Sequence, residues 1–186
     1  MRPSNRSKIL EAAVRVAQRD GVTAVTLDSV AAEASLTKGG LMYHFPSKDA
    51  LLAGIQEHVS TVWDSLMAQA AGKDAGEATA EERLAAYAEV ATQSATSADL
   101  AFVLEFSKDP NSGRMWPEVA NKWTPSPESA AADPHQFDLF IARLAADGLW
   151  MFEALMNQPL PEELRQQIAA RISTMITAPD GPSSAD

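Results

Sequence analysis

The sequence predicts an all-α protein, and three observations lead to this prediction. Apolar residues recur at helical spacing along most of the chain, alanine-rich segments are frequent, and the alternating β-branched runs typical of strands are sparse. The 186 residues have room for a small N-terminal helical domain and a larger helical domain after it.

The first two predicted helices are joined by a short connector. Residues Ser7–Asp20 form one apolar stripe, and Gly21 supplies a left-handed position that ends the helix. Residues 22–25 are too few for a core strand and are predicted to connect. Thr26 is a good N-cap for a short second helix over 27–34. The stripe of the first helix consists of Ile9, Leu10, Ala13, Val14 and Ala17.

A third short helix and a long fourth one are predicted next. Residues 35–37 form a tight turn, and Thr37 can cap a helix over Lys38–Phe45. Pro46 stops that helix because proline has no N–H to continue the ladder, and Ser47 caps the fourth helix. Two short helices joined by a three-residue turn and followed by a proline stop predict a helix-turn-helix.

The third helix is unusual for a core helix. Gly39 and Gly40 together cost about 2 kcal/mol of helix propensity relative to alanine. A helix that enters a DNA groove benefits from glycine, because its backbone can approach phosphates and base edges closely. Leu41 and Phe45 are expected to hold the helix to its neighbours, which leaves Lys38, Tyr43 and His44 on the outer face.

The segments TLDSVAAEA, at 26–34, and LTKGGLMYHFPSKDALL, at 36–52, resemble the signature of the TetR family. The resemblance covers about residues 7–55 and depends on the spacing, the turn, the Tyr-His-Phe run and the Ser-Lys pair. Two positions depart from the pattern. Ser35 stands where the family usually has glycine, so a positive φ there would carry a cost. Met42 replaces a frequent aromatic residue that contacts phosphate, and Tyr43 is expected to take over that contact.

The resemblance implies that the third helix lies in the major groove and that the start of the fourth touches the DNA backbone. Lys48 combines its charge with the free N–H groups at the start of a long helix, although a simply solvated lysine is the alternative. Arg2 and Arg6 are expected to form either a flexible arm on the flanking groove or a disordered tail. The predicted DNA-binding residues are Arg6, Thr26, Thr37, Lys38, Gly39, Gly40, Tyr43, His44 and Lys48.

The remaining sequence predicts a second helical domain. A polar break at 72–79 is followed by helices at about 80–96, 97–109 and 114–123, a loop at 124–134, and helices at about 135–157 and 161–177. The predicted domains are 1–50 for DNA binding, 51–178 for ligand binding and dimerisation, and a disordered tail at 179–186.

The helix over 135–157 is apolar on almost every side, so it must be covered on two sides. One cover is its own domain. The other is expected to be a second copy, with Ala145 and Gly148 allowing close approach, and the TetR resemblance implies a four-helix bundle about a twofold axis. A monomer with one thick core is the alternative. The predicted interface is Phe140, Leu144, Gly148, Phe152, Leu155, Leu164, Ile168 and Ile172.

Aromatic and methionine side chains concentrate in the middle of the chain and can line a ligand cavity, although an ordinary core explains each one equally well. Glu105 is the only charge in the run 100–106. It is expected either to meet a cationic ligand or to pair with Arg83 or Arg143. The predicted ligand-binding residues are Trp63, Met67, Phe102, Glu105, Phe106, Trp116, Trp123 and Trp150.

Composition and the absence of certain motifs limit the classes of protein to which this chain can be assigned. The chain has no cysteine, no apolar stretch long enough to span a membrane and no secretion signal at its start, so a cytoplasmic location is expected. The three histidines lack metal-ligand spacing, and no phosphate loop or nucleophile elbow is present. Neither an enzyme, a metal site nor a cofactor is therefore predicted.

The net charge of −10 is unevenly distributed. Residues 1–58 carry a net +1 and residues 59–186 a net −11, which suits an anion-facing module on an acidic body. A uniformly acidic protein with a neutral start fits the charge equally well. An architectural DNA-binding protein would have a basic chain.

The combined prediction is a repressor that binds a palindromic operator in double-stranded DNA as a homodimer and is released by a small hydrophobic or cationic effector. The alternative is a DNA-binding regulator without a small-molecule ligand.

Overall fold

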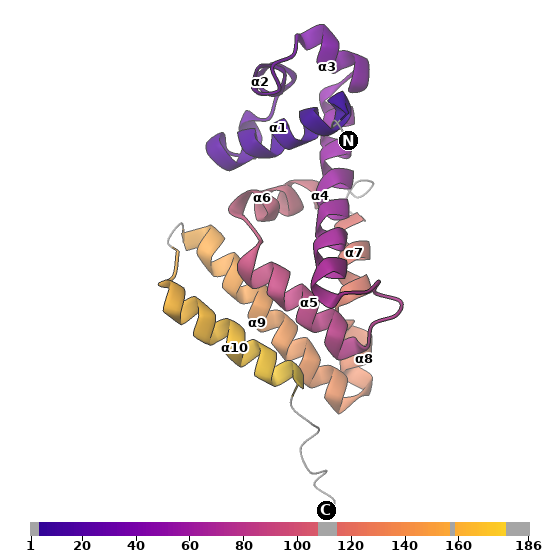
Figure 1. Ribbon diagram of the computed structural model, residues 1–186, viewed down its shortest axis with the longest axis vertical. Helices are drawn as coiled ribbons and strands as arrows, with labels where there is room; N and C mark the ends of the chain where they lie inside the picture. The colour runs from indigo at the N-terminus through magenta and orange to yellow at the C-terminus, as the bar shows by residue number, and fades with distance from the viewer. Residues whose placement is uncertain (1–3, 108–114, 157–158, 178–186) are drawn as a thin grey trace, which may run out of the picture. The chain divides into compact units, whose positions relative to one another are not determined.

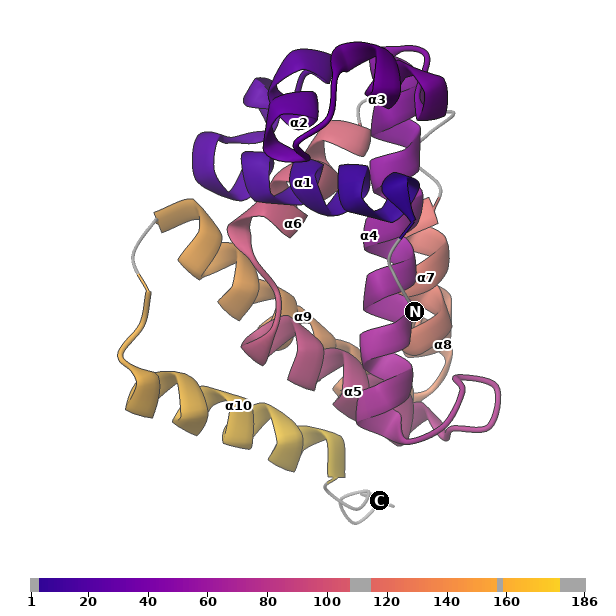
Figure 2. The same ribbon diagram turned by 45° about the horizontal axis from the view of Figure 1, so that its top comes forward.

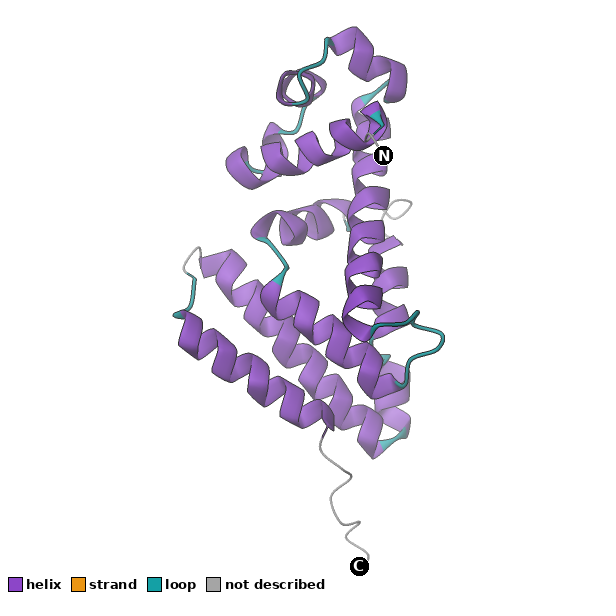
Figure 3. Cartoon of the chain, in the orientation of Figure 1, coloured by secondary structure: helices purple, strands orange, loops and turns teal. Residues whose placement is uncertain are grey.

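The computed structural model describes residues 4–107, 115–156 and 159–177, and the regular structure in these ranges is helical throughout (Figures 1 and 3). The all-α prediction is confirmed. The helices are α1 (Asn5–Asp20), the 3-10 turn η1 (Val22–Ala24), α2 (Leu27–Glu33), α3 (Lys38–His44), α4 (Lys48–Ala71), α5 (Ala80–Gln93), α6 (Ser97–Phe106), α7 (Met115–Trp123), α8 (Pro127–Ala132), α9 (Pro134–Met156) and α10 (Glu162–Thr177).

The chain forms two compact units, one of Met1–Val62 with Thr96–Pro117 and the other of Trp63–Ala95 with Glu118–Asp186. Helix α4 therefore contributes its first part to one unit and its last part to the other. This is a different division from the functional domains expected at 1–50 and 51–178, which stay a prediction. The expected tail at 179–186 lies outside the described residues, as does Arg2.

In the first unit, α1 packs on α2, and α2 packs on α3. Helix α1 starts two residues earlier than predicted, because the Ser4 hydroxyl accepts a hydrogen bond from the Ser7 N–H and caps it. Gly21, at φ 84°, ends the helix as expected. Side chains from all four N-terminal helices are fully enclosed in the core of this unit: Ile9, Ala12, Ala13, Val16, Val30, Leu41, Leu51 and Ile55.

In the second unit, α5, α9 and α10 pack against one another, and α8 packs on α9 (Figure 2). The prediction of a loop over 124–134 was wrong, because residues 127–132 form α8. The Ser126 hydroxyl accepts from the Ser129 N–H, and Pro127 occupies the first turn, where its missing N–H has no cost. None of the described helices is both long and apolar enough to cross a membrane.

Candidate DNA-binding surface and ligand region

The turn between α2 and α3 has the geometry that a helix-turn-helix requires. Ser35 has φ 56°, the only positive φ among the described non-glycine residues, as the family pattern implied. The N–H of Leu36 then bonds the Ala31 carbonyl at 2.9 Å and closes the turn. A non-glycine residue in this region costs about 1–3 kcal/mol, so the packing around the turn must hold it.

Both short helices are capped as predicted. Thr26 and Ser29 form a reciprocal capping box on α2, and the Ser29 hydroxyl also donates to the Ala24 carbonyl at 2.7 Å. The Thr37 hydroxyl accepts from the Gly40 N–H at 3.1 Å at the start of α3. These bonds make Thr26 and Thr37 part of the scaffold, whatever else they contact.

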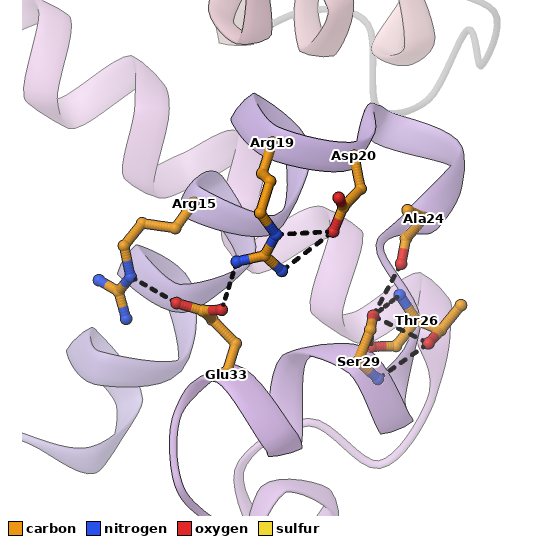
Figure 4. A network of polar contacts seen from close by, with 7 residues as sticks. All are labelled: Arg15, Arg19, Asp20, Ala24, Thr26, Ser29 and Glu33. Carbon is orange, nitrogen blue, oxygen red and sulfur yellow. Dashed lines mark hydrogen bonds and ion pairs between the residues drawn. The ribbon is translucent and has the colours of Figure 1, made fainter.

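A charge network not recognised in the sequence fixes α2 on α1 (Figure 4). Glu33 accepts from Arg15 Nε and from Arg19 Nη1, both at 2.9 Å, and Arg19 also bonds Asp20 (Figure 4). The bonds from Arg19 and then Arg15 lower the pKa of Glu33. Glu33 lies 14 and 18 residues after its two partners, which is too far for a spacing rule to find.

The outer face of α3 carries the residues expected to meet DNA. Tyr43 is 87% exposed and its ring meets the half-buried His44 edge-on, with the ring centroids 5.2 Å apart. Leu41 and Phe45 are buried and anchor the helix, as predicted.

The two glycines of α3 differ in what surrounds them. A Cβ added at Gly39 would have no atom within 4 Å, so no contact within the protein requires glycine there. At Gly40 the added Cβ would lie 3.2 Å from Thr37 Oγ1, so the cap itself favours glycine. DNA contact is therefore a stronger reason for glycine at Gly39 than at Gly40.

Two lysines mark the ends of this surface. Lys48, the first residue of α4, is exposed, and Ser47 caps that helix by accepting from the Ala50 N–H at 3.1 Å. Lys38, the first residue of α3, donates to Asp28 Oδ2 at 2.9 Å.

Arg6 was expected in a flexible arm or a disordered tail, and that expectation was wrong. It lies in the first turn of α1, because Ser4 starts the helix before it. Its guanidinium bonds Glu57 of α4 at 2.8 Å and stacks 5.4 Å from the ring centre of Phe45. Arg6 therefore joins α1 to α4 and the end of α3.

The predicted ligand-binding residues are divided between the two units. In the first unit, Phe102 and Phe106 stack with ring centroids 5.7 Å apart and are buried, while Glu105 and Trp116 are half-buried. The expected partners of Glu105, Arg83 and Arg143, each have other acceptors. They are the carbonyl oxygens of Ala78 at 2.8 Å for Arg83 and of Pro125 at 3.0 Å for Arg143.

In the second unit, Trp63, Met67, Trp123 and Trp150 are all buried. The rings of Trp63 and Trp150 lie 5.1 Å apart. The Trp123 indole donates to Asp64 at 2.6 Å, and Lys122 bonds the same carboxylate.

A polar group that the sequence did not reveal lies beside these rings. The Tyr87 hydroxyl donates to Asp147 across 60 residues of chain, and the Tyr87 ring is 6.2 Å from that of Trp63. Burial raises the pKa of Asp147 despite the opposing hydrogen bond from Tyr87 and the charge of Arg143. Burial, and then the Asp147 charge, raise the pKa of Tyr87.

His135 and Glu81 join the starts of α9 and α5, with a separation of 2.7 Å. The bond from His135 and then one from Thr79 lower the pKa of Glu81 to about 2. Among the described residues no group of three or more metal-ligating side chains comes together.

The predicted dimer face is largely exposed. On α9 an apolar stripe faces outward, and Leu164 adds to it from α10. Phe140 and Ile168 are half-buried. Ile172 is 2% exposed, because it lies on the side of α10 that packs against α5, so its assignment to the interface was wrong. The exposed α9 stripe consists of Phe137, Ile141, Leu144, Gly148, Met151, Phe152 and Leu155.

A surface groove of about 340 Å³ runs between α5 and α10, where no site was predicted. Ala88, Thr92, Gln166, Ile172 and Ile176 are among the residues that line it, and none of the eight predicted ligand-binding residues does so.

Two family models match the chain. One, described as "Bacterial regulatory proteins, tetR family", matches residues 9–55, and the other, "Tetracyclin repressor-like, C-terminal domain", matches residues 81–177. A search of curated proteins gave no match.

Solved structures share the fold. The multidrug binding protein EbrR, solved with imidazole, is 21% identical, with 92% of this chain and 96% of that one covered and a TM-score of 0.57. A transcriptional regulator from Rhodococcus sp. Rha1 is 15% identical, with 93% and 96% covered and a TM-score of 0.63. A TetR-family member from Streptomyces coelicolor A3 is 20% identical, with 91% and 98% covered and a TM-score of 0.59.

These identities establish the fold alone, whereas the C-terminal family model by itself covers just over half of the chain. With the helix-turn-helix matched as well, the chain belongs to the TetR family of transcriptional regulators.

Proposed function

We propose that the protein is a repressor that binds a palindromic operator as a homodimer and is released by a small hydrophobic effector. The observation that carries the DNA-binding part is the outer face of α3. The exposed Lys38 precedes Gly39, where no contact within the protein requires glycine, and the exposed Tyr43 follows one turn later. A capping bond and the buried Leu41 and Phe45 hold this helix in place. Such a repressor works where the DNA is, in the cytoplasm.

In this proposal, different residues contact the bases and the phosphates of the operator. Thr37, Lys38 and Gly40 are proposed to face base edges, and Lys8 and Lys48, both exposed, to face phosphates. Arg6 is held by Glu57 and contributes mainly to the scaffold. If Lys8 and Lys48 of both protomers each neutralise a phosphate, log K should fall against log[salt] with a slope of about −4.

The homodimer is supported by the exposed α9 stripe. Seven apolar or small residues on one helix face form a patch of the kind that partners cover. Gly148 lies at its centre, where an added Cβ would meet no atom of its own chain, so a second helix can approach closely there. Two recognition helices related by a twofold axis then match an inverted repeat.

The effector is proposed to be a small hydrophobic or cationic molecule bound beside Phe102, Glu105, Phe106 and Trp116, which all belong to the first unit. EbrR, which shares the fold, is described as a multidrug binding protein and was solved with ethidium and with malachite green. Aromatic rings and a carboxylate attract such compounds through stacking and cation–π contacts. Binding would favour a conformation whose recognition helices no longer match the groove, and so lower DNA affinity by linkage.

A regulator without a ligand is the second candidate, and one observation favours it. Trp63, Met67, Phe102 and Trp123 are at most 2% exposed, as in an ordinary core. Gel shifts on an operator selected from random duplexes, with and without matched cationic and neutral aromatic compounds, separate the candidates. Release by either class of compound supports the effector, and retention with every compound supports the second candidate.

Calorimetry tests the role of Glu105. Wild type should bind the cationic compound more tightly than its neutral match, and Glu105→Gln should lose that preference while keeping the neutral compound. Equal binding of both compounds by both proteins would exclude Glu105 as the site of charge recognition.

A further inference from the structure

An ion pair bridges the two helices of the helix-turn-helix. Lys38 Nζ donates to Asp28 Oδ2 at 2.9 Å, and the two side chains are 52% and 72% exposed. Asp28 lies in the first turn of α2 and Lys38 opens α3. Because capping bonds fix the start of both helices, the two side chains begin from rigid backbone.

Stability does not account for this pair. Exposed ion pairs contribute about 0–1 kcal/mol. The buried side chains of Val30 and Leu41 already pack the two helices into the core of the unit. On a surface that faces DNA, moreover, a carboxylate is unfavourable, since phosphates repel it.

The pair does affect what Lys38 can bind. A lysine ammonium has three N–H donors, so Lys38 can keep Asp28 and still donate to an acceptor on a base edge, such as guanine O6 or N7. A phosphate contact instead places a second anion beside the first. Either the two anions repel each other or Lys38 leaves Asp28 exposed next to the DNA backbone.

We propose that Asp28 is a specificity-determining residue, which positions Lys38 for base edges and suppresses its binding to phosphates on non-operator DNA. This inference rests on the proposed DNA-binding function of α3. It predicts that Asp28 weakens binding to random DNA far more than binding to the operator.

The test compares Asp28→Asn with wild type on the selected operator and on a random duplex, each across a salt series. Asn keeps the side-chain shape and removes the charge. Affinity for the random duplex should rise about tenfold, operator affinity should change less than threefold, and the operator-to-random ratio should fall accordingly. The salt slope on random DNA should steepen by about 2, one phosphate for each Lys38 of the dimer.

Asp20→Asn is the matched control. Asp20 is also an exposed carboxylate of the first unit paired with a cation, Arg19, at 2.9 Å. The Asp20→Asn substitution removes the same charge without freeing Lys38, so the operator-to-random ratio should stay at the wild-type value. Asp28→Glu, which can restore the pair, should recover most of the ratio.

Several results would overturn the inference. An equal rise of both affinities with Asp28→Asn would make Asp28 a general repulsive charge. An operator-to-random ratio that stays unchanged, as with Asp20→Asn, would show that Asp28 does not set specificity. In a Lys38→Ala background, Asp28→Asn should no longer steepen the slope on random DNA, and a persistent change would show that Lys38 is not the group released. A wild-type protein that binds no duplex would refute the proposed function itself.

Discussion

Replacing Gly54 by alanine should destabilise the first unit, although alanine favours helices. Gly54 lies within α4, and a Cβ there would come 2.5 Å from Phe45 Cε1 and 3.3 Å from Leu10 Cδ2. Ordinary contacts begin at 3.4 Å, and both neighbours are at most 3% exposed. The Phe45 ring must therefore shift by nearly an ångström within a packed core.

The magnitude follows from two opposing effects. Overpacking of a core costs about 1–3 kcal/mol, and replacing a helical glycine by alanine gains up to about 1 kcal/mol. Because the 2.5 Å contact is far closer than an ordinary one, the cost lies in the upper half of that range. The net loss of about 1–2 kcal/mol lowers the melting temperature by about 2–8 °C for a chain of this size. Operator affinity should fall too, because Phe45 ends α3 with its N–H bonded to the Leu41 carbonyl.

Thermal unfolding followed by circular dichroism measures the effect, with Gly39→Ala as the control. Gly39 is also helical, but an added Cβ meets no atom within 4 Å, so that variant should be neutral or slightly more stable. Phe45→Leu removes both ring atoms nearest the new Cβ. In the Phe45→Leu background, the loss of unfolding free energy caused by Gly54→Ala should be at least about 1 kcal/mol smaller than in wild type, because the clash with the ring is absent. If Gly54→Ala raised the melting temperature as the control does, the clash would not be the dominant effect.

Four further predictions follow from single residues. Lys48→Ala should weaken operator and random DNA alike and reduce the salt slope by about 2, and an altered base preference in binding-site selection would contradict its phosphate role. Gly148→Glu should give monomers in light scattering, since it places a charge in the proposed interface, and a persistent dimer would locate the interface elsewhere. Tyr87→Phe should lower the free energy of urea unfolding by about 1–3 kcal/mol because it leaves the half-buried Asp147 with one hydrogen bond fewer, and no loss would make that bond dispensable. Glu81→Gln should make the free energy of unfolding depend less on pH below 4.5. The Glu81 carboxyl has a pKa of about 2 in the folded protein and an ordinary value of 4.5, so it stabilises the fold above pH 4.5, and that stability is lost as the pH falls toward 2.

Much of the N-terminal unit could be predicted from short-range patterns. The stripe of α1, the left-handed Gly21, the caps at Thr26 and Thr37 and the strained Ser35 depend on interactions within about four residues of the chain. Helix α8 was missed for a related reason. Its proline- and serine-rich composition suggested a loop, although Ser126 followed by a proline is also how a helix starts.

The exposed stripe of α9 was likewise predictable, since helical spacing decides which residues share a face. Helical spacing did not predict which face of α10 is covered. Spacing places Ile172 in a row with Leu164 and Ile168, but the packing of α10 on α5 buries Ile172 and leaves Leu164 outside. That choice depends on the arrangement of whole helices.

The fold class, the helix-turn-helix and the family resemblance can be read from the amino-acid sequence, because periodicity, caps and turn residues are local signals. Which charges meet, in contrast, depends on tertiary packing. Arg6 with Glu57, Tyr87 with Asp147 and Glu33 with its two arginines are pairs separated by 14 to 60 residues. Such partners are selected by how helices pack, and no spacing along the chain encodes that packing directly. The same holds for Asp28 and Lys38, whose pairing across the turn exists because α2 and α3 are held at one fixed geometry.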